Sequence, residues 1–228
     1  MFVSCWSAKG GQGTTVVAVA LATMLARQGP PGVLLVDLAG DVPAVLGLAE
    51  PAGLGLSDWL AAGAEVPTDG LARLELTVTD DLHLLVRGRG PLDPVERVEV
   101  LAGLMADEDR SVVVDCGVPC WPGATAGAEV GPGDAAAVMA AAAAVSLVVT
   151  RACYLSLRRL VAVPMRATGV VLVSESGRAL GRREVEDVTG VEVVAEVAVE
   201  SAVARAVDAG LLAGRLPRGL ERALGRVG

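Results

Sequence analysis

A glycine-rich loop near the start of the chain holds the first residues whose types and spacing suggest chemistry. The loop reads AKGGQGTT over residues 8–15, between an apolar run at 2–7 and a helix-like stretch at 14–28. Glycines let successive backbone N–H groups curl around a phosphate, and the positive N-terminal end of the helix strengthens the attraction. Thr15 stands where a hydroxyl meets a nucleotide-bound magnesium ion in such loops. The loop predicts a phosphate site; the alternative is a turn that joins strand to helix without binding a ligand.

Lys9 lies inside this loop and is the only lysine of the chain. Every other basic residue is an arginine, so general composition does not explain a lysine here. This distribution favours a functional role for Lys9 and for the loop around it.

Two aspartates follow apolar runs that are typical of buried strands. Asp37 comes after the run at 33–36, and Asp115 comes after the run at 111–114. Ligands gather at the carboxyl ends of parallel strands, and carboxylates are preferred magnesium ligands. Both residues are therefore candidate metal ligands, while the alternative is that each carboxylate caps neighbouring backbone.

The elements that must position these residues alternate along the chain. Apolar, β-branched runs alternate with helix-length segments, which predicts βα units and a mainly parallel sheet. Several runs are apolar throughout, as are strands covered by helices on both faces. The expected strands are residues 2–7, 33–38, 82–86, 111–116, 145–150, 169–174 and 191–197, with 72–78 as an edge strand or hairpin partner. The expected helices are 14–28, 57–62, 94–106, 133–144, 155–163, 182–188, 201–209 and 217–227.

The expected fold is a single α/β domain over residues 1–228, with about seven to eight strands and helices on both faces of the sheet. The composition is 53% apolar, which supplies a core and excludes disorder and fibre classes. The chain carries 19 basic against 27 acidic residues, so it lacks the electrostatic footprint of a general nucleic-acid binder. No apolar run reaches the length of a membrane span and no signal peptide is evident, so we expect a soluble, cytoplasmic protein.

The four cysteines lie in apolar contexts and are expected to be small buried side chains. Cys116 and Cys120, with His83 as the only histidine, provide too few ligands for a zinc site. The tryptophans Trp6, Trp59 and Trp121 are expected to anchor the core or a loop.

The glycine-rich loop resembles the deviant Walker A motif, KGGxGK(S/T), of the MinD and ParA ATPases. In that family an early signature lysine crosses a nucleotide-sandwich dimer to contact the partner's ATP, and Lys9 matches it. The second lysine of the motif, which holds the β and γ phosphates, is replaced by Thr14. The nucleotide-binding positions that the resemblance implies are Gly10, Gly11, Gln12, Gly13, Thr14, Thr15 and Ser174.

The resemblance covers roughly residues 1–210. Asp37 matches the first aspartate of the family's DxD pattern in switch I, but the second, water-orienting aspartate falls on Ala39. Asp115 matches the Walker B aspartate that holds magnesium through water, and 117–134, expected to be a mobile loop, matches switch II. Ser174 stands where the family usually carries an adenine-reading Asn. Residues 145–160 are similar to the CpaE and TadZ branch.

The resemblance implies a homodimeric switch or scaffold that binds ATP or ADP with Mg²⁺ and positions cell-division, chromosome or pilus machinery with a protein partner. It assigns Lys9 and Asp37 to catalysis and Thr15, Asp37 and Asp115 to magnesium. Loss of the phosphate-binding lysine costs about 1.5–3 kcal/mol, or roughly 10- to 150-fold in affinity. Because Ala39 also lacks a carboxylate, hydrolysis is expected to be slow or absent, although Asp41 is a candidate replacement.

Two other functions stay open. One is a nucleotide-free pseudo-ATPase that dimerises through the same face, and the other is a biosynthetic ligase on the related fold, for which no cluster of catalytic groups is evident. DNA contact is a further possibility for one group of arginines, which solvated helix faces explain equally well. These arginines are Arg158, Arg159 and Arg166 with the pair Arg182 and Arg183. The helix at 217–227 could bind a membrane surface or pack against the rest of the fold. The small apolar area of this helix favours packing.

Overall fold

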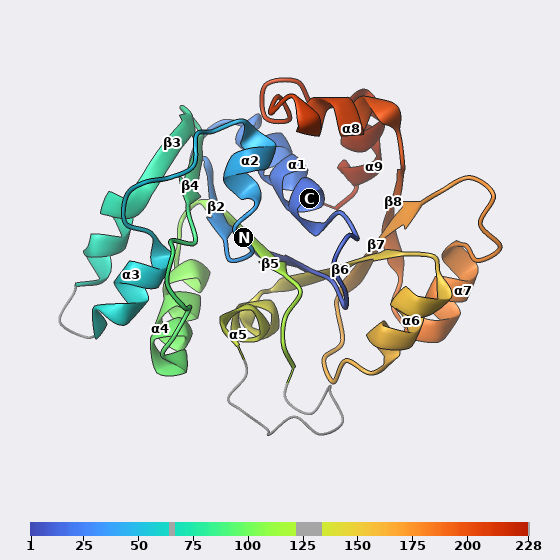
Figure 1. The fold of residues 1–228 in the computed structure, drawn as a ribbon, viewed down its shortest axis with the longest axis horizontal. Helices are drawn as coiled ribbons and strands as arrows, with labels where there is room; N and C mark the ends of the chain where they lie inside the picture. Colours follow the sequence, from blue (N-terminus) through green and yellow to red (C-terminus); the bar gives the residue numbers. More distant parts are fainter. Residues whose placement is uncertain (64–66, 122–133, 228) are drawn as a thin grey trace.

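Eight strands form one sheet in the computed structural model of the chain, which describes residues 1–63, 67–121 and 134–227. The strand order is β3-β4-β2-β5-β1-β6-β7-β8, and β3 alone runs antiparallel to its neighbour (Figure 1). The strands are β1 (Phe2–Trp6), β2 (Val33–Asp37), β3 (Glu75–Thr79), β4 (Leu82–Leu85), β5 (Ser111–Gly117), β6 (Val145–Arg151), β7 (Gly169–Ser174) and β8 (Val193–Ala198). This confirms the predicted fold class.

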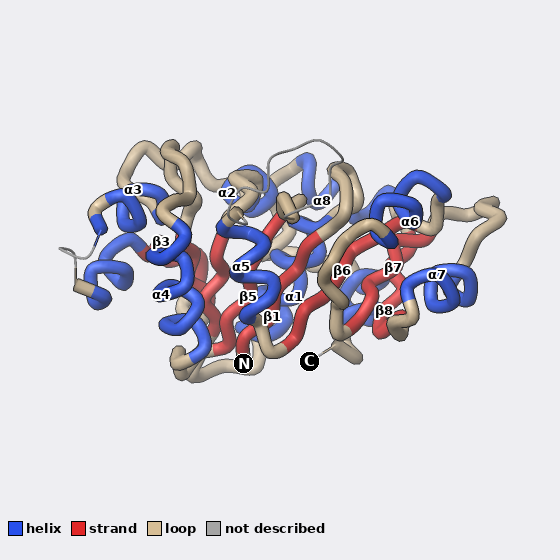
Figure 2. Tube along the Cα trace, turned by 90° about the horizontal axis from the view of Figure 1, so that it is seen from below, coloured by secondary structure: helices blue, strands red, loops and turns tan. Residues whose placement is uncertain are grey.

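Helices cover both faces of the sheet (Figures 1 and 2). One face carries α1 (Thr14–Ala26), α2 (Val42–Leu46), α8 (Ser201–Asp208) and α9 (Arg218–Leu224). The other carries α3 (Leu56–Ala61), α4 (Val95–Ala106), α5 (Ala135–Ala142), α6 (Tyr154–Val161) and α7 (Arg182–Thr189). A 3₁₀ helix, η2 (Thr68–Leu74), precedes β3. Central strands such as β1 and β2 are buried along their whole length, as two covered faces require.

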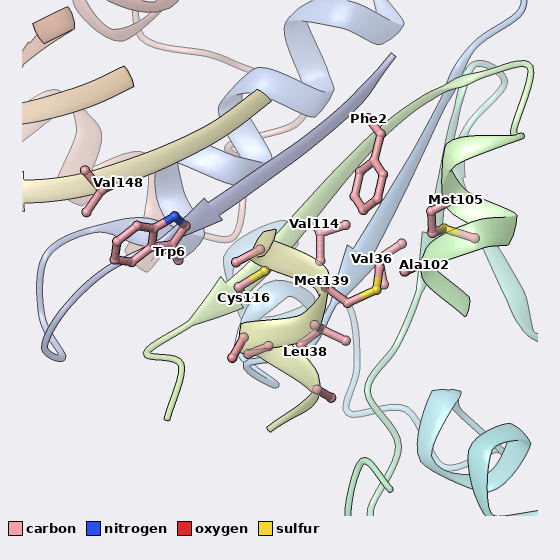
Figure 3. Packing of buried hydrophobic residues seen from close by; sticks show 14 of the residues in the cluster. Phe2, Trp6, Val36, Leu38, Ala102, Met105, Val114, Cys116, Met139 and Val148 are labelled. Carbon is pink, nitrogen blue, oxygen red and sulfur yellow. The ribbon is translucent and has the colours of Figure 1, made fainter. Parts of the chain in front are cut away.

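The core divides into two apolar layers, one on each face. On one face Phe2, Val114 and Met139 pack between the sheet and the helices α4 and α5 (Figure 3). On the other face α1 is buried beneath α2 and α9, so nearly its whole surface is apolar. Enclosure of α1 fixes the direction in which its N-terminus points.

The topology gathers the candidate residues at one edge. β1 lies between β5 and β6, and the glycine-rich loop leaves its carboxyl end. Asp37 and Asp115 are register partners at the same end of neighbouring parallel strands. The two chain ends lie close together at the opposite edge (Figure 2).

The structure departs from expectation at a few elements. The five-residue helix α2 was not predicted, because its length is too short for a periodic pattern. Cys5 and Cys116 are buried as expected, but Cys120 is exposed and Cys153 is partly exposed, so the prediction of four buried cysteines was wrong. Cys153 is the N-cap residue of α6, where its Sγ lies 3.1 Å from Oγ of Ser156, and Cys120 lies in the loop that follows β5. The predicted mobile loop at 117–134 falls largely on 122–133, outside the described residues.

The predicted C-terminal helix is present as α9 and serves in packing. Leu220 and Leu224 are fully buried, and α9 contacts α1 and β8. Its apolar face is therefore used within the fold. Among the helices described, none has the length and apolarity to cross a membrane.

Gly47 and Gly210 join α2 to the segment after α8 through a close backbone approach. Both have positive φ, and a Cβ at Gly47 would lie 2.4 Å from the carbonyl oxygen of Gly210. We predict that Gly47→Ala lowers the free energy of unfolding by about 1–3 kcal/mol, because it combines overpacking with left-handed strain. Gly53→Ala is the matched control, since a Cβ there meets nothing within 4 Å. Equal urea midpoints for the two variants would contradict this prediction.

Candidate functional site

The glycine-rich loop opens directly into α1. Gly11 and Gly13 have φ of 73° and 91°, a region that glycine reaches without strain. Gly13 is the N-cap of α1, and no side chain caps the helix there. The first N–H groups of α1 and the loop backbone are thus left to bind a ligand, and the helix dipole favours an anion.

A cavity of about 610 Å³ lies over this loop, which is within the usual size of small-molecule sites. Its walls come from the loops at the carboxyl ends of β1, β2, β4 and β5 and from the start of α5. The lining residues include Gly10–Val16, Leu38, Ala39, Asp41, Arg87, Cys116–Val118 and Asp134–Ala136. The cavity is therefore lined by segments that lie far apart in the sequence.

Asp37 and Asp115 lie side by side and are fully buried. The oxygens of Asp37 accept the N–H groups of Gly40 at 2.6 Å and Val42 at 3.3 Å. Oδ1 of Asp115 accepts the N–H of Gly117 at 3.1 Å, whereas no described group hydrogen-bonds to Oδ2. Both carboxylates thus accept backbone N–H groups, as the capping alternative requires, but Asp115 also keeps a buried oxygen without a hydrogen-bond partner among the described groups.

Burial sets the protonation of both groups. It raises the pKa of Asp37 to about 6, while the N–H groups of Gly40 and Val42 act against it. Burial raises the pKa of Asp115 to about 7; the neighbouring Thr15 hydroxyl lowers it, and the charge of Asp37 raises it. Two adjacent buried carboxylates favour a bound cation that neutralises them.

The donor set fits magnesium, which prefers carboxylate, hydroxyl and water oxygens. Thr15 lines the cavity and its hydroxyl lies near Asp115, whose Oδ2 has no hydrogen-bond partner among the described groups. Asp37 and Asp115 are buried and do not themselves line the cavity. No group of three or more His, Cys, Asp or Glu side chains within the described ranges forms a separate metal cluster.

Comparison with known proteins identifies the fold. No family model matches the chain, and no curated protein matches it. A ParA family ATPase from Chlorobium tepidum TLS superposes with a TM-score of 0.75 at 19% identity, covering 97% of this chain and 94% of that one. MinD from Pyrococcus furiosus superposes with a TM-score of 0.69 at 22% identity, covering 99% of this chain and 98% of that one. MinD from Pyrococcus horikoshii, solved with Mg-ADP, superposes with a TM-score of 0.70 at 19% identity, covering 99% of this chain and 93% of that one. The chain has the fold of the ParA and MinD ATPases.

Within this ParA/MinD fold, Gln12 and Lys9 have different surroundings. Oε1 of Gln12 accepts the N–H of Arg151 and the hydroxyl of Ser156, both at 2.9 Å, so the buried side chain ties the loop to β6 and α6. Nζ of Lys9 donates to the carbonyl of Gly10 at 3.0 Å on the exposed side of the loop. Lys9 is not among the residues that line the cavity. The structure therefore separates Lys9 from the cavity beside its own loop.

Thr14 begins α1, and Ser174 ends β7. Thr14 lines the large cavity, while the carbonyl of Ser174 accepts the N–H of Val199 at 2.9 Å. Ser174 itself lines neither that cavity nor a second, mainly apolar hollow of about 230 Å³. That hollow is bordered by Gly13, Val173 and the segment 197–204.

Two residues that line the cavity, Asp134 and Arg87, were not predicted from the sequence. Asp134 caps α5 by accepting the N–H of Ala137 at 2.9 Å, and it also accepts the N–H of Cys120 at 2.8 Å. An aspartate before an apolar helix is a recognisable capping signal. Arg87 lines the cavity because β4, which precedes it, pairs with β2. Local sequence patterns do not predict which strands pair.

We predict that Asp115→Asn stabilises the protein at about pH 8 without magnesium. The pKa of Asp115 in the folded state exceeds the value of about 3.9 in the unfolded chain, so folding favours the protonated form. Its contribution to stability is present below about pH 4 and is lost as the pH rises through about 7. An amide removes this loss, which amounts to at least about 1 kcal/mol.

The measurement is urea unfolding at about pH 8 and about pH 5, with the exposed Asp80→Asn as control. The gain at high pH should shrink at low pH, where the wild-type carboxyl is protonated. A variant that is less stable than wild type at about pH 8 would show that the buried carboxylate is compensated.

Proposed function

We propose that this protein is a nucleotide-dependent switch or scaffold that binds ATP or ADP with Mg²⁺. The observation that carries the proposal is the open N-terminus of α1 beneath a cavity of about 610 Å³, beside a buried carboxylate with an unsatisfied oxygen. Backbone N–H groups of Gly10–Gly13 and the hydroxyls of Thr14 and Thr15 hold the phosphates. Thr15, Asp37 and Asp115 hold the ion, which supplies positive charge to the phosphate oxygens.

The apolar hollow on the other side of the loop supports binding of a base. It adjoins Gly13 and is walled by Val173, Val197, Val199 and Val203. A flat heteroaromatic ring gains from burial against such side chains. Ser174, next to Val173, is the proposed neighbour of the base, in the place where the family usually has Asn.

A homodimer is the proposed assembly. Gly10 and Gly11 are exposed, a Cβ at either position would meet nothing within 4 Å, and Lys9 lies on the same open side. This leaves room for a second copy to approach the loop, with Lys9 contacting the partner's nucleotide. The solved relatives include a MinC:MinD complex from Aquifex aeolicus, which supports a protein partner in a positioning system for cell division, chromosomes or pili. Membership of the CpaE and TadZ branch is part of this proposal.

Hydrolysis is proposed to be slow or absent. Thr14 has no charge to stabilise the transferring phosphoryl group, and Ala39 lines the cavity without a group that orients water. Asp41 lines the same wall and is the residue to test for that role. Because Thr14 replaces the phosphate-binding lysine of the motif, a nucleotide-free pseudo-ATPase is the alternative function.

The test is a calorimetric titration of nucleotide-stripped protein with Mg-ATP, followed by sizing. We predict binding with dimerisation, and a dimer weakened about tenfold or more by Lys9→Ala, equivalent to about 1.4 kcal/mol. Arg73→Ala, which removes an exposed positive charge elsewhere, is the control.

The other outcomes discriminate among the candidate functions. Absence of heat and of any size change up to millimolar Mg-ATP would favour the pseudo-ATPase. Binding and dimerisation that Lys9→Ala leaves unchanged would remove Lys9 from the interface while keeping the nucleotide site.

A further inference from the structure

The large cavity is poor in positive charge. Among its described lining residues, Asp41 and Asp134 are acidic and Arg87 is the only basic one. Asp37 and Asp115 lie buried nearby. A nucleoside triphosphate brings several more negative charges, so its binding to this site calls for a cation besides magnesium.

Arg87 is fixed at the cavity wall from both its backbone and its side chain. Its carbonyl accepts the N–H of Ser57 at 2.8 Å. The next residue, Gly88, packs so closely on Gly55 that a Cβ at Gly55 would lie 2.5 Å from the N atom of Gly88. One guanidinium nitrogen donates to the carbonyl of Leu38. These contacts hold the half-buried side chain across the loop that follows β2.

The loop after β2, which Arg87 crosses, carries only small side chains at the point of contact. A Cβ at Gly40 would lie 3.5 Å from Cδ of Arg87, which is ordinary contact, and the adjacent position is Ala39. The guanidinium has five donors, and the Leu38 carbonyl accepts from only one nitrogen. Arg87 forms no ion pair with any described carboxylate, so its charge is not already used.

We propose that Arg87 binds the terminal phosphate of the nucleotide and supplies the charge that Thr14 lacks. The inference rests on the proposed function and names a phosphate ligand that no motif indicates. A planar guanidinium donates two parallel hydrogen bonds to phosphate oxygens, so it performs this role from a different element than a loop lysine does.

The other nearby cations are committed elsewhere. Lys9 donates to its own loop on the exposed side and is proposed to contact the nucleotide of the partner copy, not that of its own copy. Arg151 pairs with Glu175 at 2.6 Å and borders the apolar hollow rather than the large cavity. Arg87 is therefore the cation that the described part of one copy offers to the phosphates of its own nucleotide.

The experiment compares Mg-ATP affinity by calorimetry for wild type, Arg87→Gln and Arg89→Gln. Arg89 is the matched control, because it lies two residues away, is exposed and does not line the cavity. We expect Arg87→Gln to weaken Mg-ATP binding about 10- to 150-fold, as loss of a charge-assisted contact does. Arg89→Gln should change it less than about twofold.

A second variant separates phosphate binding from a structural role at Leu38. Thr14→Lys in the Arg87→Gln background restores a cation from the glycine-rich loop, so affinity should recover most of the loss. Restoring a charge at position 14 would not replace the contact with the Leu38 carbonyl. Thermal midpoints of the ligand-free variants report on that contact independently.

Each outcome decides between the two proposals. Equal Mg-ATP affinity of Arg87→Gln and wild type would overturn the role of Arg87 and leave the nucleotide site standing. Loss of binding with a lowered ligand-free midpoint and no rescue by Thr14→Lys would make Arg87 an anchor of Leu38 only. Absence of Mg-ATP binding by wild type would overturn the proposed function and this inference with it.

Discussion

The burial of Asp37 beside Asp115 constrains the whole carboxyl edge of the sheet. Two carboxylates removed from water are costly unless backbone donors, protons or a cation compensate them. Asp37 obtains backbone donors, and in doing so it shapes the turn at Gly40 and the start of α2. Asp115 keeps one oxygen unsatisfied. That oxygen has no partner among the described groups, which is the physical basis of the metal site that we propose.

The glycine-rich loop depends on the way α1 is enclosed. Because α1 is buried between the sheet, α2 and α9, its axis cannot reorient. Gln12 fastens the loop sideways to β6 and α6 through two hydrogen bonds. The backbone N–H groups are thus presented in a preorganised state, and preorganisation lowers the entropic cost of binding a phosphate.

The positive charge at the cavity comes from a different element than it does in the motif that the loop resembles. That motif places a lysine in the loop, whereas here position 14 is a threonine and Arg87 enters from the end of β4. Either arrangement puts a cation at the edge where the strands end. In the proposed function, phosphate binding and hydrolysis are separable, because binding needs donors and charge while hydrolysis also needs a group that orients water.

The sequence by itself determined the strands, most helices and the strand-end placement of Asp37 and Asp115, because these follow from local hydrophobic patterning. It also located the glycine-rich loop, whose conformation depends on nearby residues. Tertiary structure alone decided that Arg87 reaches the cavity, that Gln12 is used as a tie and that Oδ2 of Asp115 is unsatisfied. Those properties depend on pairing between strands far apart in the chain, and no local spacing encodes which distant groups will share a buried environment.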